Sequence, residues 1–201
     1  MNHLLKSISY IFHPLIMPLL GVLFYFSKTP RFIPEQLMKA KLFSVTILTL
    51  ILPILLFYLL KTLNKVESIH LENVYERRIP LLINCFIILL ILIRVLPITE
   101  IPELYFFFIG ILISNITCFV LAVVKFKASI HMIASSGFFM FAVALAIHFK
   151  ININGTIALM CIILGAIATS RLHMKAHNSL ELIVGFFVGL LPQLVLLNYW
   201  M

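Results

Sequence analysis

Aspartate is absent from this sequence, and its absence limits the chemistry available to the chain. The acidic side chains are seven glutamates, whereas lysine and arginine together number 15 in 201 residues. Enzymes that transfer prenyl or phosphatidyl groups usually hold magnesium with several Asp carboxylates. The sequence therefore argues against both of these enzyme classes. Any chemistry in the C-terminal half that needs a carboxylate side chain must use Glu181, because no other glutamate follows Glu103.

Charged residues of either sign are also scarce. They make up 11% of the chain, whereas hydrophobic residues make up 63% and the mean hydropathy is +1.15. In soluble domains about a quarter of the residues are charged. This composition therefore excludes an ordinary soluble domain and predicts an integral membrane protein. The formal net charge of +8 comes from basic residues in short loops between apolar runs. That distribution is typical of membrane-flanking anchors and not of nucleic-acid binding.

Cysteine is sparse and has no ligand spacing. Cys85, Cys118 and Cys161 each lie inside an apolar run and form no CxxC pair, so neither a disulfide framework nor a zinc site is indicated. The first apolar stretch ends without a small-residue cleavage pattern. We therefore expect it to be retained as a span and not removed as a signal peptide.

Seven apolar stretches are long enough to cross a bilayer as helices, which takes about 17 to 25 residues. They cover residues 8–26, 42–60, 79–96, 104–124, 132–149, 153–169 and 180–200. The sequence thus predicts an all-α polytopic membrane helix bundle that forms a single domain over residues 1–201. His13-Pro14 and Pro18 interrupt the first stretch. If that stretch is broken or re-entrant, six full spans remain.

Three loops hold most of the unusual polar residues: 61–78, 125–131 and 170–177. Two predicted spans separate each loop from the next, so all three emerge on one membrane face. Charged residues near a bilayer are costly, and a cluster of them between spans predicts a functional site. The residues that this parity brings to one end of the bundle are Arg77, Arg78, Lys127, His131, Arg171 and His177.

His177 and Glu181 stand four residues apart at the start of the last span, a spacing that places them on one helix face. A carboxylate there can accept a hydrogen bond from one ring nitrogen and leave the other as a nucleophile or base. The segment from Asn178 to Glu181 also fits a capping box, in which the carboxylate satisfies a backbone donor. Arg171, whose guanidinium suits bidentate phosphate contact, favours a functional site.

The segment around these residues resembles a known family signature. Ser170-Arg171, five residues, His177, three residues and Glu181 are similar to the third signature of the type 2 phosphatidic acid phosphatase superfamily, SRxxxxxHxxxD. Glu replaces the final Asp. The resemblance is strongest here.

The other two signatures of that superfamily are matched less well. Ala128-Ser129-Ile130-His131 is similar to the second, PSGH, but lacks its Pro and Gly. Residues 76–80, Glu-Arg-Arg-Ile-Pro, resemble the Arg-Pro end of the first, KxxxxxxRP, although Ile79 intervenes and neither His70 nor Leu71 is the expected Lys. The resemblance therefore covers a phosphatase-like core of roughly residues 70–195.

The resemblance implies hydrolysis of a phosphate ester without a metal or other cofactor. His177 would attack phosphorus to form a phosphohistidine, Glu181 would orient it, and His131 would protonate the leaving alcohol. The phosphate oxygens would be bound by Arg171, Ser129, Arg78 and Lys127. A site at the membrane interface implies a lipid phosphate or pyrophosphate of polyprenyl or glycerolipid type as substrate.

The departures from the signatures leave a second hypothesis open. A catalytically degenerate relative would bind anionic lipid or a partner membrane protein instead of turning over a substrate. Orientation is open as well. The membrane face with the three polar loops carries nine basic residues and the other face carries six, so the positive-inside rule would place the loops in the cytoplasm. If the four basic residues of the candidate site (Arg77, Arg78, Lys127 and Arg171) are left out, the count is five against six and the rule does not decide the orientation. The resemblance implies a bacterial inner membrane with the site toward the outer face.

Two further features carry smaller expectations. His13 precedes a proline in the first apolar stretch, and we expect it to be interfacial or structural. Gly185 and Gly189 lie four residues apart in phase with His177 and Glu181. We expect these glycines to allow close helix contact.

Overall fold

A computed structural model describes residues 2–66 and 73–201, with side chains from Ser7 onward. His70 and Leu71, where the first signature departs from the family pattern, lie outside the described residues, as does the beginning of the 70–195 core. The described residues form helices and no strand. The helices are α1 (Asn2–Ile11), α2 (Met17–Lys28), α3 (Glu35–Thr46), α4 (Leu52–Thr62), α5 (Arg78–Leu90), α6 (Pro102–Val123), α7 (Ile130–Phe149), α8 (Asn154–His173) and α9 (Ser179–Leu196).

Six helical segments of the described chain are long and apolar enough to cross a membrane. They are Glu35–Thr62, Tyr75–Val95, Pro102–Val123, Ile130–Phe149, Asn154–His173 and Ser179–Tyr199. The first joins α3 and α4 through a π-helical turn, Ile47–Ile51, just before Pro53, which lacks the N–H that regular helix would need. The prediction of an all-α polytopic helix bundle is confirmed.

The first apolar stretch is broken, as the prolines had indicated. Helix α1 ends at Ile11, a turn contains His13 and Pro14, and α2 begins only at Met17. Proline removes a backbone donor and disfavours helical geometry in the residue before it. The 12 residues of α2 rise about 18 Å, which is too short for a bilayer core of about 30 Å. The bundle therefore has the six-span form.

The central pair of helices is α7 and α9, which approach closely because glycine lines their contact. A Cβ added at Gly185 would lie 2.8 Å from the backbone oxygen of Ser129, and one at Gly189 would collide with the Ile133 carbonyl. The backbone N–H of Ser129 also donates to the Glu181 carbonyl at 3.1 Å. The expected role of these glycines is confirmed. The close contact and the backbone hydrogen bond together hold the start of α7 against the start of α9.

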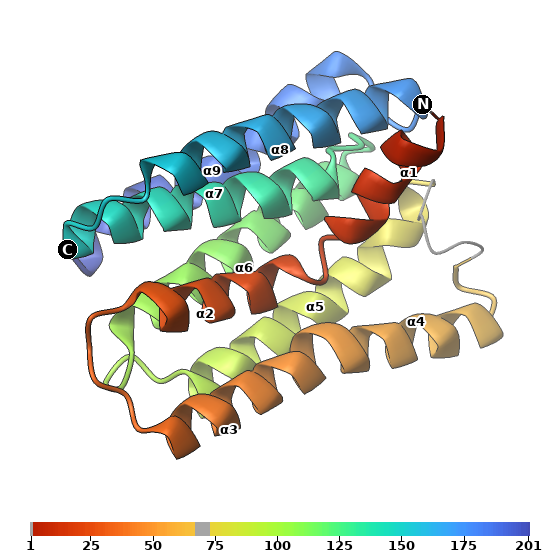
Figure 1. Cartoon of the computed structure of the whole chain (residues 1–201). Helices are drawn as coiled ribbons and strands as arrows, with labels where there is room; N and C mark the ends of the chain where they lie inside the picture. The colour runs from red at the N-terminus through yellow and green to blue at the C-terminus, as the bar shows by residue number, and fades with distance from the viewer. Residues whose placement is uncertain (1, 67–72) are drawn as a thin grey trace.

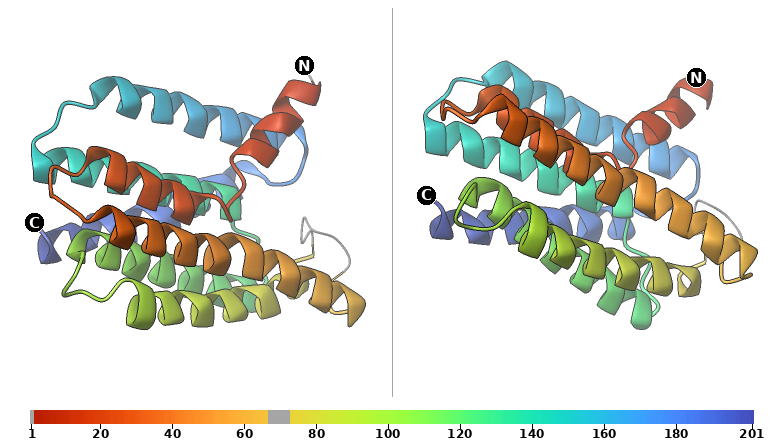
Figure 2. Two further views of the ribbon diagram at one scale, coloured as in Figure 1. Left: turned by 60° about the horizontal axis from the view of Figure 1, so that its bottom comes forward. Right: turned by 90° about the horizontal axis from the view of Figure 1, so that it is seen from below.

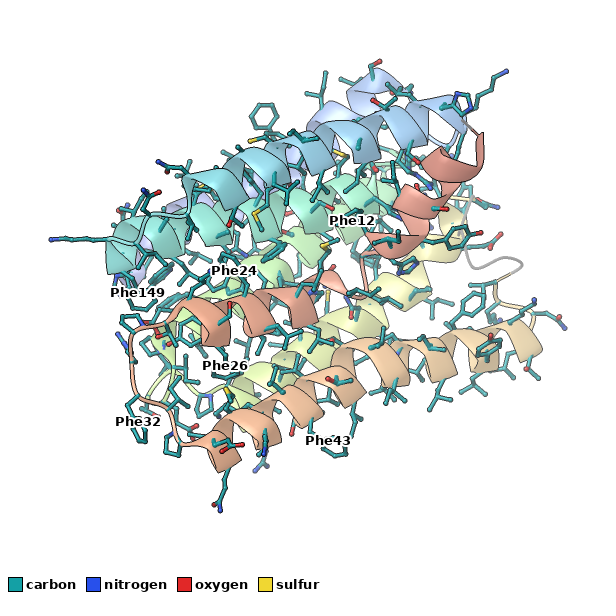
Figure 3. The ribbon with its side chains drawn as sticks, in the orientation of Figure 1. Phe12, Phe24, Phe26, Phe32, Phe43 and Phe149 are labelled. Atoms are coloured by element: carbon teal, nitrogen blue, oxygen red, sulfur yellow. The ribbon has the colours of Figure 1, made fainter. Side chains whose placement is uncertain are left out.

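The remaining helices surround this pair. Helix α7 also packs against α2 and α8, and α6 packs against α5 and α9. Helices α3 and α4 form the lower edge of the bundle in Figure 1 and run across the front of the other helices when this edge is turned toward the viewer (Figure 2). There Phe43 points away from the bundle in Figure 3, as does Phe32 in the preceding loop, and both are exposed. In the core, Phe107 of α6 stacks on Phe141 of α7, with ring centroids 4.2 Å apart.

The two ends of the bundle carry different segments. The described parts of the α4–α5 connection, the α6–α7 loop and the α8–α9 loop lie at one end together with α1 (Figure 1). The α2–α3, α5–α6 and α7–α8 connections lie at the other end, beside the C-terminus. The three polar loops therefore share one end, as their two-span separations had predicted.

Candidate functional site

A cavity of about 240 Å³ connects the polar end with the interior of the bundle. Its walls come from α2, α4, α5, α6, α7 and α9, and it reaches the end of α8 and the loop before α9. Most of the lining side chains are apolar. Its basic lining residues are His13, Arg77, His131, Arg171 and His177, and no carboxylate is found among the described residues that line it.

His177 is held by Glu181 in one defined tautomer. The Nδ1 atom of His177 lies 2.7 Å from Oε2 of Glu181. Since an ionised carboxylate only accepts, Nδ1 carries the hydrogen. In a neutral ring the lone pair is then on Nε2. His177 is buried, and this burial, together with the nearby guanidiniums of Arg77 and Arg171, lowers the pKa of its imidazole despite the opposing effect of Glu181.

The capping box at the start of α9 is present as well. The side chain of Asn178 accepts from the Glu181 backbone N–H at 2.9 Å, and the Asn178 backbone N–H donates to Oε2 of Glu181 at 3.3 Å. The same carboxylate oxygen therefore caps the helix and fixes the histidine tautomer. The structure therefore contains both of the contacts that the sequence offered as alternatives, the helix cap and the hydrogen bond to His177.

His131 lies in the first turn of α7 and contacts the N-terminal helix. Its Nε2 is 3.2 Å from the backbone oxygen of Ser9 in α1. A carbonyl oxygen only accepts, so Nε2 carries a hydrogen and Nδ1 is the nitrogen left for other chemistry. Ser9 is anchored in turn, because its hydroxyl shares a 2.8 Å hydrogen bond with that of Ser170.

Two buried arginines approach the same space from different helices. Arg171 lies in the last turn of α8, and Arg77 lies in the turn that precedes α5. Arg77 donates from Nη1 to the Ala128 carbonyl at 2.9 Å, which holds the α6–α7 loop beside Ser129. Both guanidiniums line the cavity. Positive charge therefore predominates around His177.

The structure does not bring every predicted phosphate-binding residue to the cavity. Arg78 donates to the carbonyls of Ala122 and Val123 at the end of α6 and lies over the Tyr75 ring, and it does not line the cavity. Its neighbour Arg77 takes that place. The two arginines differ because the turn before α5 points consecutive side chains in different directions.

Lys127 and Ser129 also lie outside the cavity lining. Lys127 is half-buried in the α6–α7 loop. Ser129 is fully buried, and its hydroxyl has no hydrogen-bond partner among the described residues. Of the predicted site, the structure groups His177, Glu181, His131 and Arg171 around the cavity mouth.

His13, which was expected to be interfacial or structural, also lies at this cavity. Its ring lines the cavity and lies edge-on to the ring of His131, with centroids 5.6 Å apart. The available signal was the His-Pro sequence at the break in the first apolar stretch, which forced a turn at this depth. Ser9 was missed, and no sequence pattern distinguished it from other helical serines.

The described residues contain no group of three or more His, Cys or Glu side chains that are placed to hold a metal ion. Comparison with family models, with curated protein sequences and with solved structures finds no match to this chain. The resemblance to the phosphatase signatures therefore stays a prediction, and the function must be argued from the site.

Proposed function

We propose that the protein is a membrane phosphatase that hydrolyses a lipid phosphate or pyrophosphate, of polyprenyl or glycerolipid type, through a phosphohistidine intermediate. One observation carries this proposal. A histidine with a carboxylate-fixed tautomer, a second histidine and two arginines reach one cavity from three separate polar loops of the chain. Phosphoryl transfer requires mainly positioning and positive charge, which these groups supply.

The reaction would proceed in two displacements. The Nε2 lone pair of His177 attacks phosphorus, the bond from phosphorus to the alcohol oxygen breaks, and protonated His131 gives its Nδ1 proton to that oxygen. Water then attacks the phosphohistidine while neutral His131 takes its proton, and the phosphorus–nitrogen bond breaks. The products are the alcohol and phosphate, and both histidines return to their starting states.

The lipid class is supported by the cavity walls. Away from the basic group they consist mostly of apolar side chains of α4, α5 and α6, which suit a hydrocarbon chain. Turnover of purified protein against a panel of lipid phosphates tests the proposal. Phosphate release should persist in EDTA and disappear in His177→Ala, whereas His173→Ala, which changes an exposed histidine at the same end, should retain it. Loss of turnover on chelation, restored by a divalent ion, would reject the phosphohistidine scheme.

A non-enzymatic lipid- or partner-binding protein is the second candidate, and the replacement of the signature's Asp by Glu181 favours it. The same panel separates the two functions. If wild type and His177→Ala both lack turnover yet bind anionic lipid vesicles equally, the binding function is the correct one.

We further propose that the site faces outward from a bacterial inner membrane. Single cysteines in a background lacking the three native ones test this orientation. Asn73→Cys, Val124→Cys and His173→Cys, all at exposed positions of the polar end, should react with an impermeant thiol reagent on intact cells. Asn152→Cys at the other end should not. The reverse pattern would place the site in the cytoplasm.

A further inference from the structure

His13 occupies a position that only the break in the first apolar stretch creates. It follows the last turn of α1 and precedes Pro14, and α2 begins at Met17. Helix α2 therefore begins close to His13 inside the bundle. The positive end of the α2 dipole lies near the cavity that His13 lines. This segment lies outside the 70–195 region of phosphatase resemblance.

The ring of His13 has a defined hydrogen-bonding state. Its Nδ1 atom accepts from the backbone N–H of Leu15 at 3.4 Å, a contact that requires a lone pair on Nδ1. The hydrogen of a neutral ring is then on Nε2, which makes this atom a donor. The same ring stands edge-on to His131, with an interplanar angle of 79°.

We propose that His13 is a phosphate-binding residue that donates from Nε2 to a phosphate oxygen of the bound substrate. It would supply the donor that the chain lacks where the first signature has its Lys. This inference rests on the proposed phosphatase function. It adds to the site a third histidine, contributed by the N-terminal segment.

Two substitutions separate this role from simple packing against His131. His13→Phe keeps an aromatic ring beside His131 but removes the donor, whereas His13→Gln keeps a donor and removes the ring. Hydrogen bonds to charged groups are the stronger ones. His13→Phe should therefore lower kcat/KM and the affinity for orthovanadate, a phosphate mimic, by roughly tenfold. His13→Gln should retain most of both.

The controls are melting temperature in detergent, which both variants should share with wild type, and His173→Phe, which should behave as wild type. A His13→Phe variant with unchanged kinetics and vanadate affinity overturns the proposal, as does a His13→Gln variant that loses as much as His13→Phe. Wild type without turnover and without vanadate binding rejects the phosphatase function itself, and the role of His13 with it. An active wild type combined with an unaffected His13→Phe rejects only His13.

Discussion

Two polar clusters lie at opposite ends of this bundle, and they differ in how their charges are balanced. At the end opposite the cavity mouth, Glu103 is fully buried and has three partners: Arg31 at 2.8 Å, the Tyr25 hydroxyl at 3.2 Å and Nε2 of His148 at 3.4 Å. None of these four residues lines the cavity. The cluster joins α2, α6 and α7 around one carboxylate.

The cluster at the cavity mouth has the opposite composition. Two arginines and three histidines line the cavity, and one of these residues, His177, is hydrogen-bonded to Glu181. A buried carboxylate needs its surrounding donors, because losing one of the partners leaves a buried charge uncompensated and destabilises the fold. A cavity lined by an excess of positive charge instead favours the entry of an anion. We therefore expect a structural role for the Glu103 end and a ligand-binding role for the His177 end.

The largest expected effects come from exchanging a carboxylate for an amide at each end. Glu181→Gln keeps the size of the side chain and much of its capping capacity but loses the charge that orients His177. We expect turnover to fall roughly 100-fold or more, with little change in melting temperature. Glu181→Asp, which restores the signature residue, should retain part of the rate.

Glu103→Gln should show the opposite pattern. Turnover should stay within about twofold of wild type, because no substrate-facing group depends on Glu103. The free energy of unfolding should fall by roughly 1 to 3 kcal/mol, a modest loss since Arg31 is half-exposed and its charge is screened. Enzyme assays and thermal melts of the two variants provide the test. A Glu103→Gln variant that loses turnover while it remains folded would contradict the division of roles.

The sequence predicted the helix bundle, and it predicted that four residues, His177, Glu181, His131 and Arg171, lie at the same end of it. Span lengths follow from hydropathy, loop parity follows from the span count, and the His177–Glu181 pair follows from helical periodicity. The choice between Arg77 and Arg78 was not accessible in this way, since it depends on the direction of a short turn packed on the end of α6. The His-Pro sequence indicated a turn at His13, but the approach of His13 to His131 could not be predicted, because the two residues are remote in sequence and only tertiary packing joins them.

The two adjacent arginines give the next prediction. Arg77→Lys removes the guanidinium that binds the Ala128 carbonyl and lines the cavity, and lysine cannot reproduce its planar donor geometry. We expect roughly tenfold lower kcat/KM and weaker vanadate binding. Arg78→Lys is the matched control, and its effect should be confined to melting temperature. Equal kinetic losses in both variants would show that Arg78 also reaches the substrate.

The smallest expected effect is a pH dependence of stability that comes from His177. Burial lowers the pKa of this imidazole in the folded protein below its ordinary value of about 6.5. The unfolded chain therefore binds more protons than the folded one between these two pKa values. Stability should be fully present above pH 6.5 and should fall as the pH drops toward the folded pKa, by at most about 1.4 kcal/mol per pH unit.

His177→Asn removes this linkage, so its melting temperature should decrease less than that of wild type between pH 7 and pH 5. His173→Asn, at an exposed position, should keep the wild-type slope. If melts across this pH range give parallel curves for wild type and His177→Asn, the lowered pKa of His177 is wrong.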